Sequence, residues 1–377
     1  MPINSLFKSY RNKALIKIAI VFIFIAVIII ITSSIIMYNA LIKSAEEKIE
    51  YNLNCAAEKI SLSNIEADAI SKTMVLSQYE VLFGKRESSV DLVENVLKES
   101  NMLTGASIGY EPNADGKDNT YKNNSTKYAP AIDQIGRFLP YLFRPIDNPK
   151  NIGLEKLVDM NTSMYYQGVK ERFHSNNPQK SLITEPYIYE GKMMVEHCNP
   201  IVRNNKFYGV ACVDRALFDI DKFLNNLKPY KTADFDLVSR LGKIISSTYN
   251  QDSKTKNISD LPSFNIFNDL FKPNSKKIQE HEYNKQVYYY AAKVIKPGEW
   301  VLIMRVSKSE ILAPIYNTLF LAVLIGLMCV TISIVILNKI TALLENPIND
   351  IYSYSNQISE GDLSEKQVHA SGIESNE

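Results

Sequence analysis

The chain has 377 residues, of which 42 are basic and 41 acidic, so its formal net charge is +1. It has no long basic stripe, so the electrostatic signature of a nucleic-acid-binding protein is missing and we expect no nucleic-acid partner. The 22 tyrosines in a chain that is 46% hydrophobic fit packed strands and pockets better than disorder. The central part of the chain is long enough for one large or two small hydrophobic cores.

Two long apolar runs, Ile18 to Met37 and Asn317 to Leu337, bracket this central part. About twenty apolar residues in a helix cover the ~30 Å hydrocarbon core of a bilayer. The first run is longer than the apolar part of a signal peptide, and residues 38–40 make a poor cleavage site, so a retained anchor is favoured over a cleaved signal. The sequence therefore predicts a protein that crosses a membrane twice.

The charges that flank the first run predict its orientation. Basic residues alone precede it, namely Lys8, Arg11, Lys13 and Lys17. After it, three glutamates join two lysines, namely Lys43, Glu46, Glu47, Lys48 and Glu50. Basic flanks stay in the cytoplasm. We therefore expect a bacterial cell-membrane protein with both termini in the cytoplasm and the central part outside the cell.

The four cysteines are Cys55, Cys198, Cys212 and, within the second apolar run, Cys329. Cys198 and Cys212 lie on two strand-like runs joined by residues 203–206, so a hairpin would place them opposite each other or one step out of register. A cross-strand disulfide is one interpretation. Two buried free thiols that pack as small apolar residues are the other, which we favour because a disulfide needs geometry that a sequence does not supply.

From Tyr38 to Phe83 there is no glycine and no proline, and apolar residues recur mostly three to five positions apart. This pattern predicts one long helix that continues the first span and extends ~65 Å from the membrane. An alternative is a helix broken into pieces around residues 61–64.

The next part of the chain is predicted to be an α+β module. Ser88 or Ser89 is a suitable N-cap for a second helix, and Leu103–Tyr110 has the character of a strand. A loop-rich stretch from Glu111 to Thr162 follows, of a length that often carries recognition. Three further strands and a helix complete the module, at 182–189, 192–202, 206–214 and 216–227.

A second, smaller module repeats this plan, with predicted strands at 235–239, 244–248, 286–294 and 300–306 and a polar insertion between the second and third. The predicted fold class is α+β, with the long N-terminal helix and two tandem antiparallel-sheet modules between two transmembrane helices. The expected segments are a cytoplasmic N-terminus (1–17), a first transmembrane helix (18–37), a long extracytoplasmic helix (38–85), a membrane-distal module (86–229), a membrane-proximal module (230–310), a second transmembrane helix (317–337) and a cytoplasmic tail (338–377).

Five short segments occur in an order that resembles a known family. They are Gly109–Asp118, with a Glu-Pro-Asn loop, then Gly136–Tyr141, Thr184–Tyr187, Pro200–Ile201 and Gly209–Asp214. Together they resemble the double Cache sensor domain of bacterial methyl-accepting chemotaxis receptors, sensor kinases and related receptors. The likeness covers residues from about 40 to 310 and implies that both modules are PAS-like Cache modules.

The resemblance implies that a small ligand binds the distal module, between its sheet and its long loop. In the family, an aromatic pair and an acid at a strand end often form the pocket, and the corresponding positions here are Tyr165, Tyr166 and Asp214. Three residues of the matched segments complete this set of candidate ligand-binding residues, namely Glu111, Tyr141 and Tyr187.

The amino-acid-binding branch of the family carries an arginine two positions before its Trp-Tyr pair. Thr162 or Ser163 occupies that position here, and residue 164 or 165 replaces the tryptophan. A hydroxyl cannot make the bidentate, charge-assisted contact that arginine makes with a carboxylate, which argues against amino-acid recognition through that position. Arg137 or Arg144 is a candidate to take over the role.

The residues themselves leave alternatives open. Asp214 ends an apolar run, so it either caps the helix that begins at Ala216, faces a cleft, or does both. Tyr165 and Tyr166 would point to different faces of an extended chain, so at most one is expected to line a pocket and either could be a core residue.

The acidic loop of Asn113, Asp115 and Asp118 has part of the spacing of a calcium loop but lacks its terminal glutamate. Turn formation explains these residues better, and we expect no metal and no cofactor. The histidines are scattered without metal-ligand spacing, at positions 174, 197, 281 and 369. Neither a phosphate-binding glycine loop nor a nucleophile elbow is present, so we expect no enzyme.

After the second span, Pro347-Ile348, Ile351, Ile358 and Gly361–Leu363 resemble the first helix and exit turn of a HAMP signal-relay module. Apolar positions 344, 348, 351 and 358 are spaced near a heptad, which favours a parallel bundle with a second copy and hence a homodimer. A HAMP module has a second helix, which would begin where this sequence ends. We therefore expect either a fragment or a tail that pairs with another protein.

The sequence thus predicts a transmembrane receptor that binds a small extracellular solute in its distal module and passes a signal through its second span, with chemotaxis as the first expectation. The ligand class is open among amines, amino acids, organic acids and purines. A cytoplasmic signalling partner or a further output domain is expected. The alternatives are the input half of a sensor histidine kinase or of a diguanylate cyclase, and a structural surface protein that binds no ligand.

Overall fold

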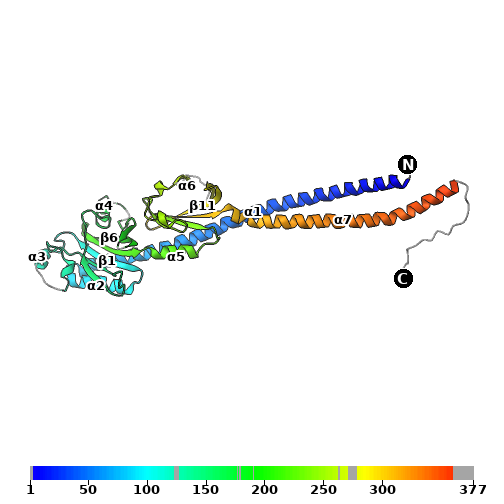
Figure 1. The fold of residues 1–377 in the computed structure, drawn as a ribbon. Coiled ribbons are helices and arrows are strands. Elements are labelled where there is room, and N and C mark those ends of the chain that lie inside the picture. The colour runs from blue at the N-terminus through cyan, green and yellow to red at the C-terminus, as the bar shows by residue number, and fades with distance from the viewer. Residues whose placement is uncertain are drawn as a thin grey trace. The chain divides into compact units, whose positions relative to one another are not determined.

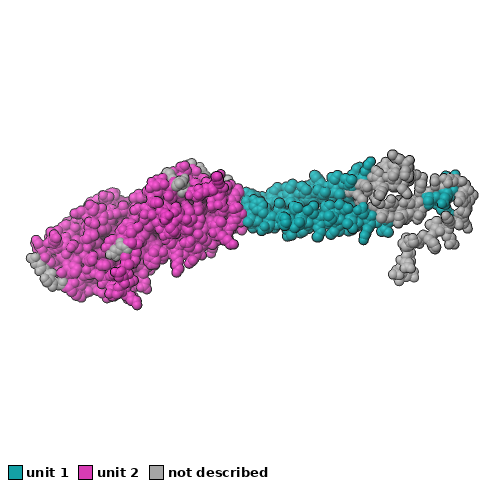
Figure 2. Space-filling view, viewed as in Figure 1, with its two compact units in different colours: residues 1–41, 312–377 teal, residues 42–311 magenta. Residues whose placement is uncertain are grey.

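The computed structural model describes residues 3–122, 127–175, 177, 180–189, 191–261, 264–270 and 278–359. The chain forms two compact units, one of residues 42–311 and one that combines residues 1–41 with residues 312–377. Figure 2 colours these units separately, and helices α1 and α7 have residues in both. Two antiparallel sheets lie in the unit of residues 42–311, so the predicted α+β class with two sheet modules is confirmed.

Helix α1 runs without interruption from Ile3 to Ser77 and is followed by a π-helical turn, Gln78–Leu82 (Figure 1). The absence of glycine and proline between Tyr38 and Phe83 removes the two residues that most strongly break helices. The predicted long helix is confirmed, without the break considered at residues 61–64. One face of its outer part is buried, at Ala45, Ile49, Ala56, Ile60, Ala67 and Met74.

The first sheet, which we call the distal sheet, has the strand order β3-β2-β1-β7-β6-β4, with β5 also paired to β6. Its strands are β1 (Leu103–Tyr110), β2 (Pro140–Phe143), β3 (Gly153–Lys156), β4 (Leu182–Ile183), β5 (Tyr187–Tyr189), β6 (Lys192–Arg203) and β7 (Lys206–Ala216). The strand predicted at 103–110 is confirmed, whereas the one predicted at 182–189 is two strands. β2 and β3 lie in the predicted loop. Each has only four residues and begins with Pro or Gly, which hides it from strand patterns.

The two faces of the distal sheet have different cover. Helices α1 and α2 (Arg86–Glu99) pack on one face, where Met74 and Val93 meet Ala106 and Val213. The π-helical turn Met164–Gly168 and helix α4 (Val169–His174) lie on the other face. Because side chains alternate along a strand, neighbouring residues of β6 and β7 face α1 and the opposite side in turn. The remaining short helices of this region are α3 (Asp118–Tyr121) and α5 (Phe218–Asn226).

Helix α2 begins earlier than predicted, at Arg86, so the expected N-cap at Ser88 or Ser89 is wrong. Ser89 lies within the first turn and is buried, and its Oγ donates to the Lys85 carbonyl at 2.9 Å. The first helical residue, Arg86, is buried, and each nitrogen of its guanidinium donates a hydrogen bond.

Arg86 ties α2 to the loop that precedes α3. Its guanidinium donates to Asp115 from Nε at 2.8 Å and from Nη2 at 2.7 Å, and to Asp118 Oδ1 at 2.5 Å. The second oxygen of Asp118 accepts from the Asn113 N–H at 2.6 Å. The acidic residues weighed as a calcium loop therefore hold an arginine and a turn.

The second sheet, which we call the proximal sheet, has the strand order β10-β11-β12-β8-β9. Its strands are β8 (Asp234–Val238), β9 (Ile244–Ser247), β10 (Ile278–Tyr283), β11 (Gln286–Ile295) and β12 (Trp300–Ser307), with helix α6 (Phe264–Leu270) packed on it. Four of these strands were predicted. The edge strand β10 was missed because its sequence, Ile-Gln-Glu-His-Glu-Tyr, is too polar to stand out.

Cys198 and Cys212 are directly opposite each other on β6 and β7 and form a disulfide, with their Cα atoms 4.1 Å apart. The favoured interpretation as two free thiols is therefore wrong. The hairpin could place the cysteines in or out of register, and the observed register pairs them. Cys55 and Cys329 are free thiols.

The unit of residues 1–41 and 312–377 contains parts of α1 and of α7 (Lys308–Ser359). Each of these helices has a stretch long and apolar enough to span a membrane, and large apolar side chains are exposed along both. The hydroxyl groups of Thr32, Ser34 and Ser333 donate to carbonyls one turn back, at 2.7 to 2.8 Å. Such bonds satisfy polar groups within the helix, as a lipid environment requires.

Helix α7 continues from the second apolar stretch to Ser359. The residues expected to form the exit turn of a HAMP module, Gly361–Leu363, lie outside the described residues, as do the side chains of Pro347 and Ile348. The HAMP module and the homodimer therefore stay predictions.

Replacement of Arg86 tests the contacts of α2. Arg86→Ala leaves the carboxylates of Asp115 and Asp118 buried without their partner, and we expect it to lower the free energy of unfolding by about 3–5 kcal/mol. Thermal and urea unfolding of the detergent-solubilised chain, followed by circular dichroism, measures the loss. Lys98→Ala breaks the exposed ion pair with Glu94 and should change it by less than about 0.5 kcal/mol. Equal effects of the two variants would contradict the assignment.

Peptide mapping tests the disulfide. We expect mass spectrometry of the non-reduced, alkylated chain to find the peptides of Cys198 and Cys212 cross-linked and those of Cys55 and Cys329 alkylated, because only the first pair is bonded in the described structure. Alkylation of Cys198 and Cys212 without prior reduction would contradict the observed pairing.

Candidate functional site

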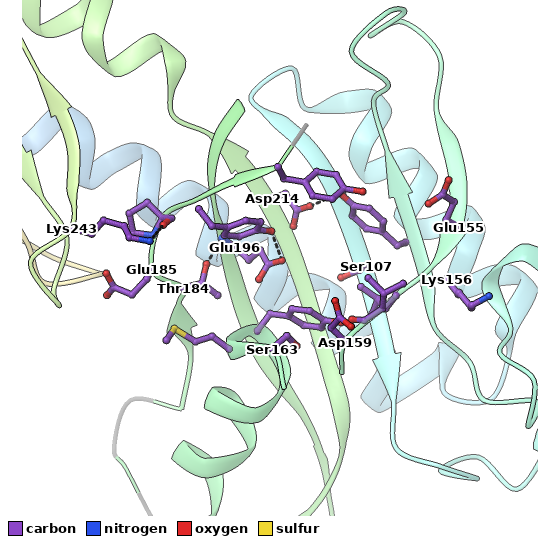
Figure 3. Close-up of a pocket in the computed structure, with 18 residues that line it drawn as sticks. Ser107, Glu155, Lys156, Asp159, Ser163, Thr184, Glu185, Glu196, Asp214 and Lys243 are labelled. Atoms are coloured by element: carbon purple, nitrogen blue, oxygen red, sulfur yellow. Dashed lines mark hydrogen bonds between the residues drawn. The ribbon is translucent and has the colours of Figure 1, made fainter. Parts of the chain in front are cut away.

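A cavity of about 430 Å³ lies on the face of the distal sheet opposite α1. Its floor comes from three central strands, through Ser107 of β1, Glu196 of β6 and Asp214 of β7. Its walls are the segment after β3, the turn around Tyr165, and the segment Thr184–Tyr187 between β4 and β5. Figure 3 shows Glu196 and Asp214 in the middle of the cavity, with Glu155 and Lys156 on one side and Glu185 and Lys243 on the other.

Two carboxyl groups dominate the floor. Glu196 and Asp214 are directly opposite each other on β6 and β7, and both reach into the cavity. No basic side chain lies within 4.0 Å of either carboxyl group in the described part of the chain. Their hydrogen-bond partners are tyrosines: Tyr187 donates to Glu196 Oε1 at 2.8 Å, and Tyr141 donates to Asp214 Oδ2 at 2.9 Å.

Burial changes the ionisation of this pair. Desolvation first, and then repulsion by Asp214, raises the pKa of Glu196 to about 8. Desolvation also raises the pKa of Asp214, to about 6, although the Tyr141 hydroxyl opposes it. Burial raises the pKa of both tyrosines as well, so these hydroxyls stay protonated and donate. Near neutral pH the pair therefore carries about one negative charge, mainly on Asp214, with no basic side chain beside it.

The floor is closely packed around Asp214. Gly105 of β1 is its neighbour on the adjacent strand, and a Cβ atom at Gly105 would lie 2.4 Å from Asp214 Oδ2 and 2.8 Å from the Tyr141 ring. A side chain at this position would displace the Asp214 carboxyl group, so glycine keeps it within reach of Tyr141.

Four of the eight candidate residues line the cavity, namely Tyr141, Tyr165, Tyr187 and Asp214. Their contact with a ligand stays a prediction. Asp214 does not cap the following helix: α5 begins at Phe218, and its N-cap residue, Leu217, makes no side-chain bond. The cap interpretation of Asp214 is therefore wrong, because the strand continues two residues beyond it.

The other candidates of the aromatic and loop segments meet away from the cavity. Tyr166 and Tyr165 lie in a π-helical turn rather than an extended segment, and only Tyr165 reaches the cavity. The Tyr166 hydroxyl donates to Glu111 Oε1 and accepts from Arg137 Nη2 at 2.9 Å. Lys170 Nζ lies 2.6 Å from the same Glu111 oxygen. Burial opposes it, yet the hydrogen bonds from Lys170 and Tyr166 hold the pKa of Glu111 below its ordinary value.

Neither arginine considered for carboxylate recognition lines the cavity. Arg137 donates from Nε to the Tyr110 carbonyl, which fixes the loop onto β1. Arg144 donates to the Leu97 carbonyl and, at 2.9 Å, to that of Pro149. Both guanidinium groups are used to hold main chain.

Sequence reasoning missed Glu196, the nearest carboxyl partner of Asp214. The glutamate occupies the middle of an apolar strand, and this position was the available signal. Its meaning depends on the register that pairs it with Asp214, which is not visible in the sequence. Ser107, Asp159 and Lys243 also line the cavity and were not predicted, because they come from segments far apart in the chain.

The wall segment Thr184–Tyr187 also touches the proximal sheet. Pro186 accepts from Lys243 Nζ at 3.1 Å, and Glu185 Oε2 accepts from Ser239 Oγ at 2.5 Å. Ser239 and Lys243 close the turn between β8 and β9. One wall of the cavity is therefore held by the proximal module.

Comparison with known proteins agrees with this arrangement. Residues 90–222 match the model of a family described as methyl-accepting chemotaxis protein-like, first PDC sensor domain. The extracellular domain of mmHK1S-Z2, a protein assigned as a histidine kinase, is 26% identical with a TM-score of 0.60, over 70% of this chain and 99% of that one. No curated protein matches the sequence.

Two receptor structures share the fold at lower identity. Methyl-accepting chemotaxis protein X is 20% identical with a TM-score of 0.55, over 69% of this chain and 96% of that chain. The sensory domain of the Campylobacter jejuni chemoreceptor Tlp3 (CcmL), solved with isoleucine bound, is 13% identical with a TM-score of 0.50, over 72% of this chain and 96% of that chain.

The match of residues 90–222 to a sensor-domain family and the fold shared with the extracellular domain of mmHK1S-Z2 confirm the predicted resemblance to double Cache sensor domains. The family match and the 26% identity to the extracellular domain of mmHK1S-Z2 support a ligand-sensing receptor. Its two apolar helices, together with this family, indicate a membrane protein.

The carboxyl pair makes stability depend on pH in a defined direction. A raised pKa means that folded Glu196 keeps a proton that the unfolded chain releases, so this contribution to stability is complete below about pH 4.5 and is lost as the pH rises towards 8. We expect Glu196→Gln to be more stable than the parent chain at about pH 8.5, by about 1–3 kcal/mol, and nearly equal at about pH 4.5.

Urea unfolding of the solubilised chain at the two pH values measures this difference. Glu155→Gln changes an exposed carboxyl group at the edge of the same cavity and serves as the matched control. A difference between Glu196→Gln and parent that is largest at acidic pH would contradict the ionisation we describe.

Proposed function

We propose that the chain is a transmembrane receptor whose distal cavity binds a small organic cation such as an amine. The observation that carries this proposal is the pair of buried carboxyl groups, Glu196 and Asp214, which face one cavity without a basic side chain beside them. A buried negative charge without a basic side chain beside it costs free energy, and a positively charged ligand offsets that cost.

The rest of the lining supports a cation. Four tyrosines, Tyr141, Tyr165, Tyr187 and Tyr189, bring aromatic rings to the cavity, and such rings attract ammonium groups. Three further acidic residues, Glu155, Asp159 and Glu185, stand against two lysines in the lining. One of those lysines, Lys243, is held by the Pro186 carbonyl. An organic acid or an amino-acid carboxylate would meet this excess of negative charge without an arginine to bind it.

For the membrane part, we propose two spans with both termini in the cytoplasm and the sensor domain outside a bacterial cell. The basic flank of residues 8–17 supports this orientation. The tail after the second span is proposed to form the first helix of a HAMP module in a homodimer and to act on a cytoplasmic partner or output domain. Its heptad-like apolar spacing supports such a bundle.

The proposed output is chemotaxis, because the matching family model describes the sensor domain of methyl-accepting receptors. Control of a histidine kinase is the second candidate, favoured by the 26% identity to the extracellular domain of mmHK1S-Z2. Both outputs would use the same cavity.

A ligand panel tests the proposal on the whole chain in lipid nanodiscs. We expect amines such as choline or putrescine to raise the unfolding temperature, whereas organic acids and purines do not. A ligand at one hundred times its Kd stabilises the folded state by about 2.7 kcal/mol. Asp214→Asn should abolish the shift, because Asp214 is the member of the pair that is ionised near neutral pH and supplies the negative charge that the cation needs.

The matched control is Glu111→Gln, which changes a carboxyl group that contacts Tyr166 and Lys170 outside the cavity lining. It should keep the ligand-induced shift. An organic acid or purine whose effect survives Asp214→Asn would overturn the cation assignment. A flat response to the whole panel would favour a structural surface protein.

A further inference from the structure

Strands β6 and β7, which carry Glu196 and Asp214, have a second set of buried polar residues on the face opposite the cavity. Asp214 and Glu196 face the cavity, whereas the next residue of each strand, Arg215 and His197, faces α1. Arg215 is 3% exposed and His197 is fully buried. α1 covers this face closely, since Ser71 Oγ donates to the Ala211 carbonyl of β7 at 2.8 Å.

Arg215 forms a hydrogen bond to α1, and its partner there is the side-chain amide of Asn64 rather than a carboxylate. Its Nη1 donates to Asn64 Oδ1 at 2.7 Å, and no acidic side chain lies within 4.0 Å in the part of the chain that the structure describes. Desolvation therefore lowers the pKa of Arg215. Burial and the nearby Arg215 charge also lower the pKa of His197, to about 3, so the imidazole stays neutral. Such groups are expensive to bury for packing alone.

Asn64 uses both ends of its amide. While Oδ1 accepts from Arg215, Nδ2 donates to the Pro297 carbonyl at 3.3 Å. Pro297 lies in the turn between β11 and β12 of the proximal sheet, and Ser61, one turn earlier on α1, donates to the neighbouring Lys296 carbonyl. This fully buried asparagine thus joins the pocket strand β7, the long helix and the proximal module.

The same turn also meets the distal module beside the cavity. A Cβ atom at Gly298 would lie 3.1 Å from Ile183 Cδ1 on β4, so the turn packs against the strand that leads into the wall segment. The link through Asn64 is therefore not a loose surface contact, because apolar packing confines the turn next to it.

We propose that Asn64 is a positioning residue that transmits the state of the distal cavity to α1 and to the proximal turn. The inference rests on the proposed receptor function. A change of charge at Asp214 and Glu196 moves the backbone of β7, and the next residue, Arg215, carries that movement to Asn64. Asn64 in turn pulls on the main chain at Pro297. A buried polar link of this kind has few alternative partners, so it couples its two ends strongly.

The test replaces the unidentified ligand by a change within the cavity. Asp214→Asn removes one charge of the pair, and hydrogen exchange of the chain in nanodiscs, followed by mass spectrometry over residues 292–300, reads the proximal turn. We expect Asp214→Asn to change exchange there by about threefold or more. In an Asn64→Asp background the change should vanish, because aspartate still accepts from Arg215 but cannot donate to Pro297.

Ser239→Ala is the matched control, since it breaks a different hydrogen bond between the distal and proximal modules, the one from Ser239 to Glu185 of the cavity wall, and should leave the change intact. The proposal is overturned if the turn does not respond to Asp214→Asn, if the response persists in Asn64→Asp, or if Ser239→Ala alone removes it. A purely structural role of Asn64 would raise exchange at the turn without removing the response. Should Asn64→Asp not fold, Asn64→Ser, which is too short to reach Pro297, replaces it.

The outcome is separable from that of the ligand panel. A flat panel with intact coupling would reject the cation receptor and keep the transmission through Asn64. An amine-induced shift without coupling would do the reverse. Asn64→Asp itself should keep any amine-induced shift in unfolding temperature, because Asn64 does not line the cavity.

Discussion

Two buried carboxyl groups on neighbouring strands, Glu196 and Asp214, face the same cavity, and the surrounding side chains must accommodate them. Tyr141 and Tyr187 each donate one hydroxyl to the pair, and Gly105 leaves room for it. Neutral donors reduce the cost of two buried acids but do not cancel it. A positively charged solute would offset the remaining cost, which is the physical basis of the proposed cation recognition.

Because side chains alternate along a strand, the residues next to the carboxyl pair lie on the opposite face of the sheet. Residues 196 and 214 face the cavity, and residues 197 and 215 face α1, so both sides of β6 and β7 carry buried polar groups. The disulfide between Cys198 and Cys212 fixes the register of the two strands two residues away. The disulfide opposes slippage between the two strands and so keeps Glu196 opposite Asp214. The proposed transmission through Asn64 uses the face of these strands that packs on α1.

The sequence predicted a structural feature correctly where a single residue or one continuous stretch of the chain determines that feature. The uninterrupted helix α1 followed from the absence of glycine and proline, and Asp214 followed from a strand-end acid in a matched segment. Glu196 could not be predicted, because its role arises only from its register with Asp214. The place of Arg137 could not be predicted for a related reason: the fold brings its guanidinium to the Tyr110 carbonyl rather than to the cavity lining.

The proximal sheet also combines tyrosines and a carboxylate, but there they surround a positive charge that the chain itself supplies through Arg305. There, the Arg305 guanidinium lies 3.6 Å from the centre of the Tyr249 ring and 4.8 Å from that of Tyr288, and it pairs with Asp234 at 3.1 Å. Tyrosines and carboxylates thus surround a positive charge supplied by the chain itself. The distal cavity has the tyrosines and the carboxylates, but its floor carries no such arginine in the described lining. A solute cation would complete in the distal module what Arg305 completes in the proximal one.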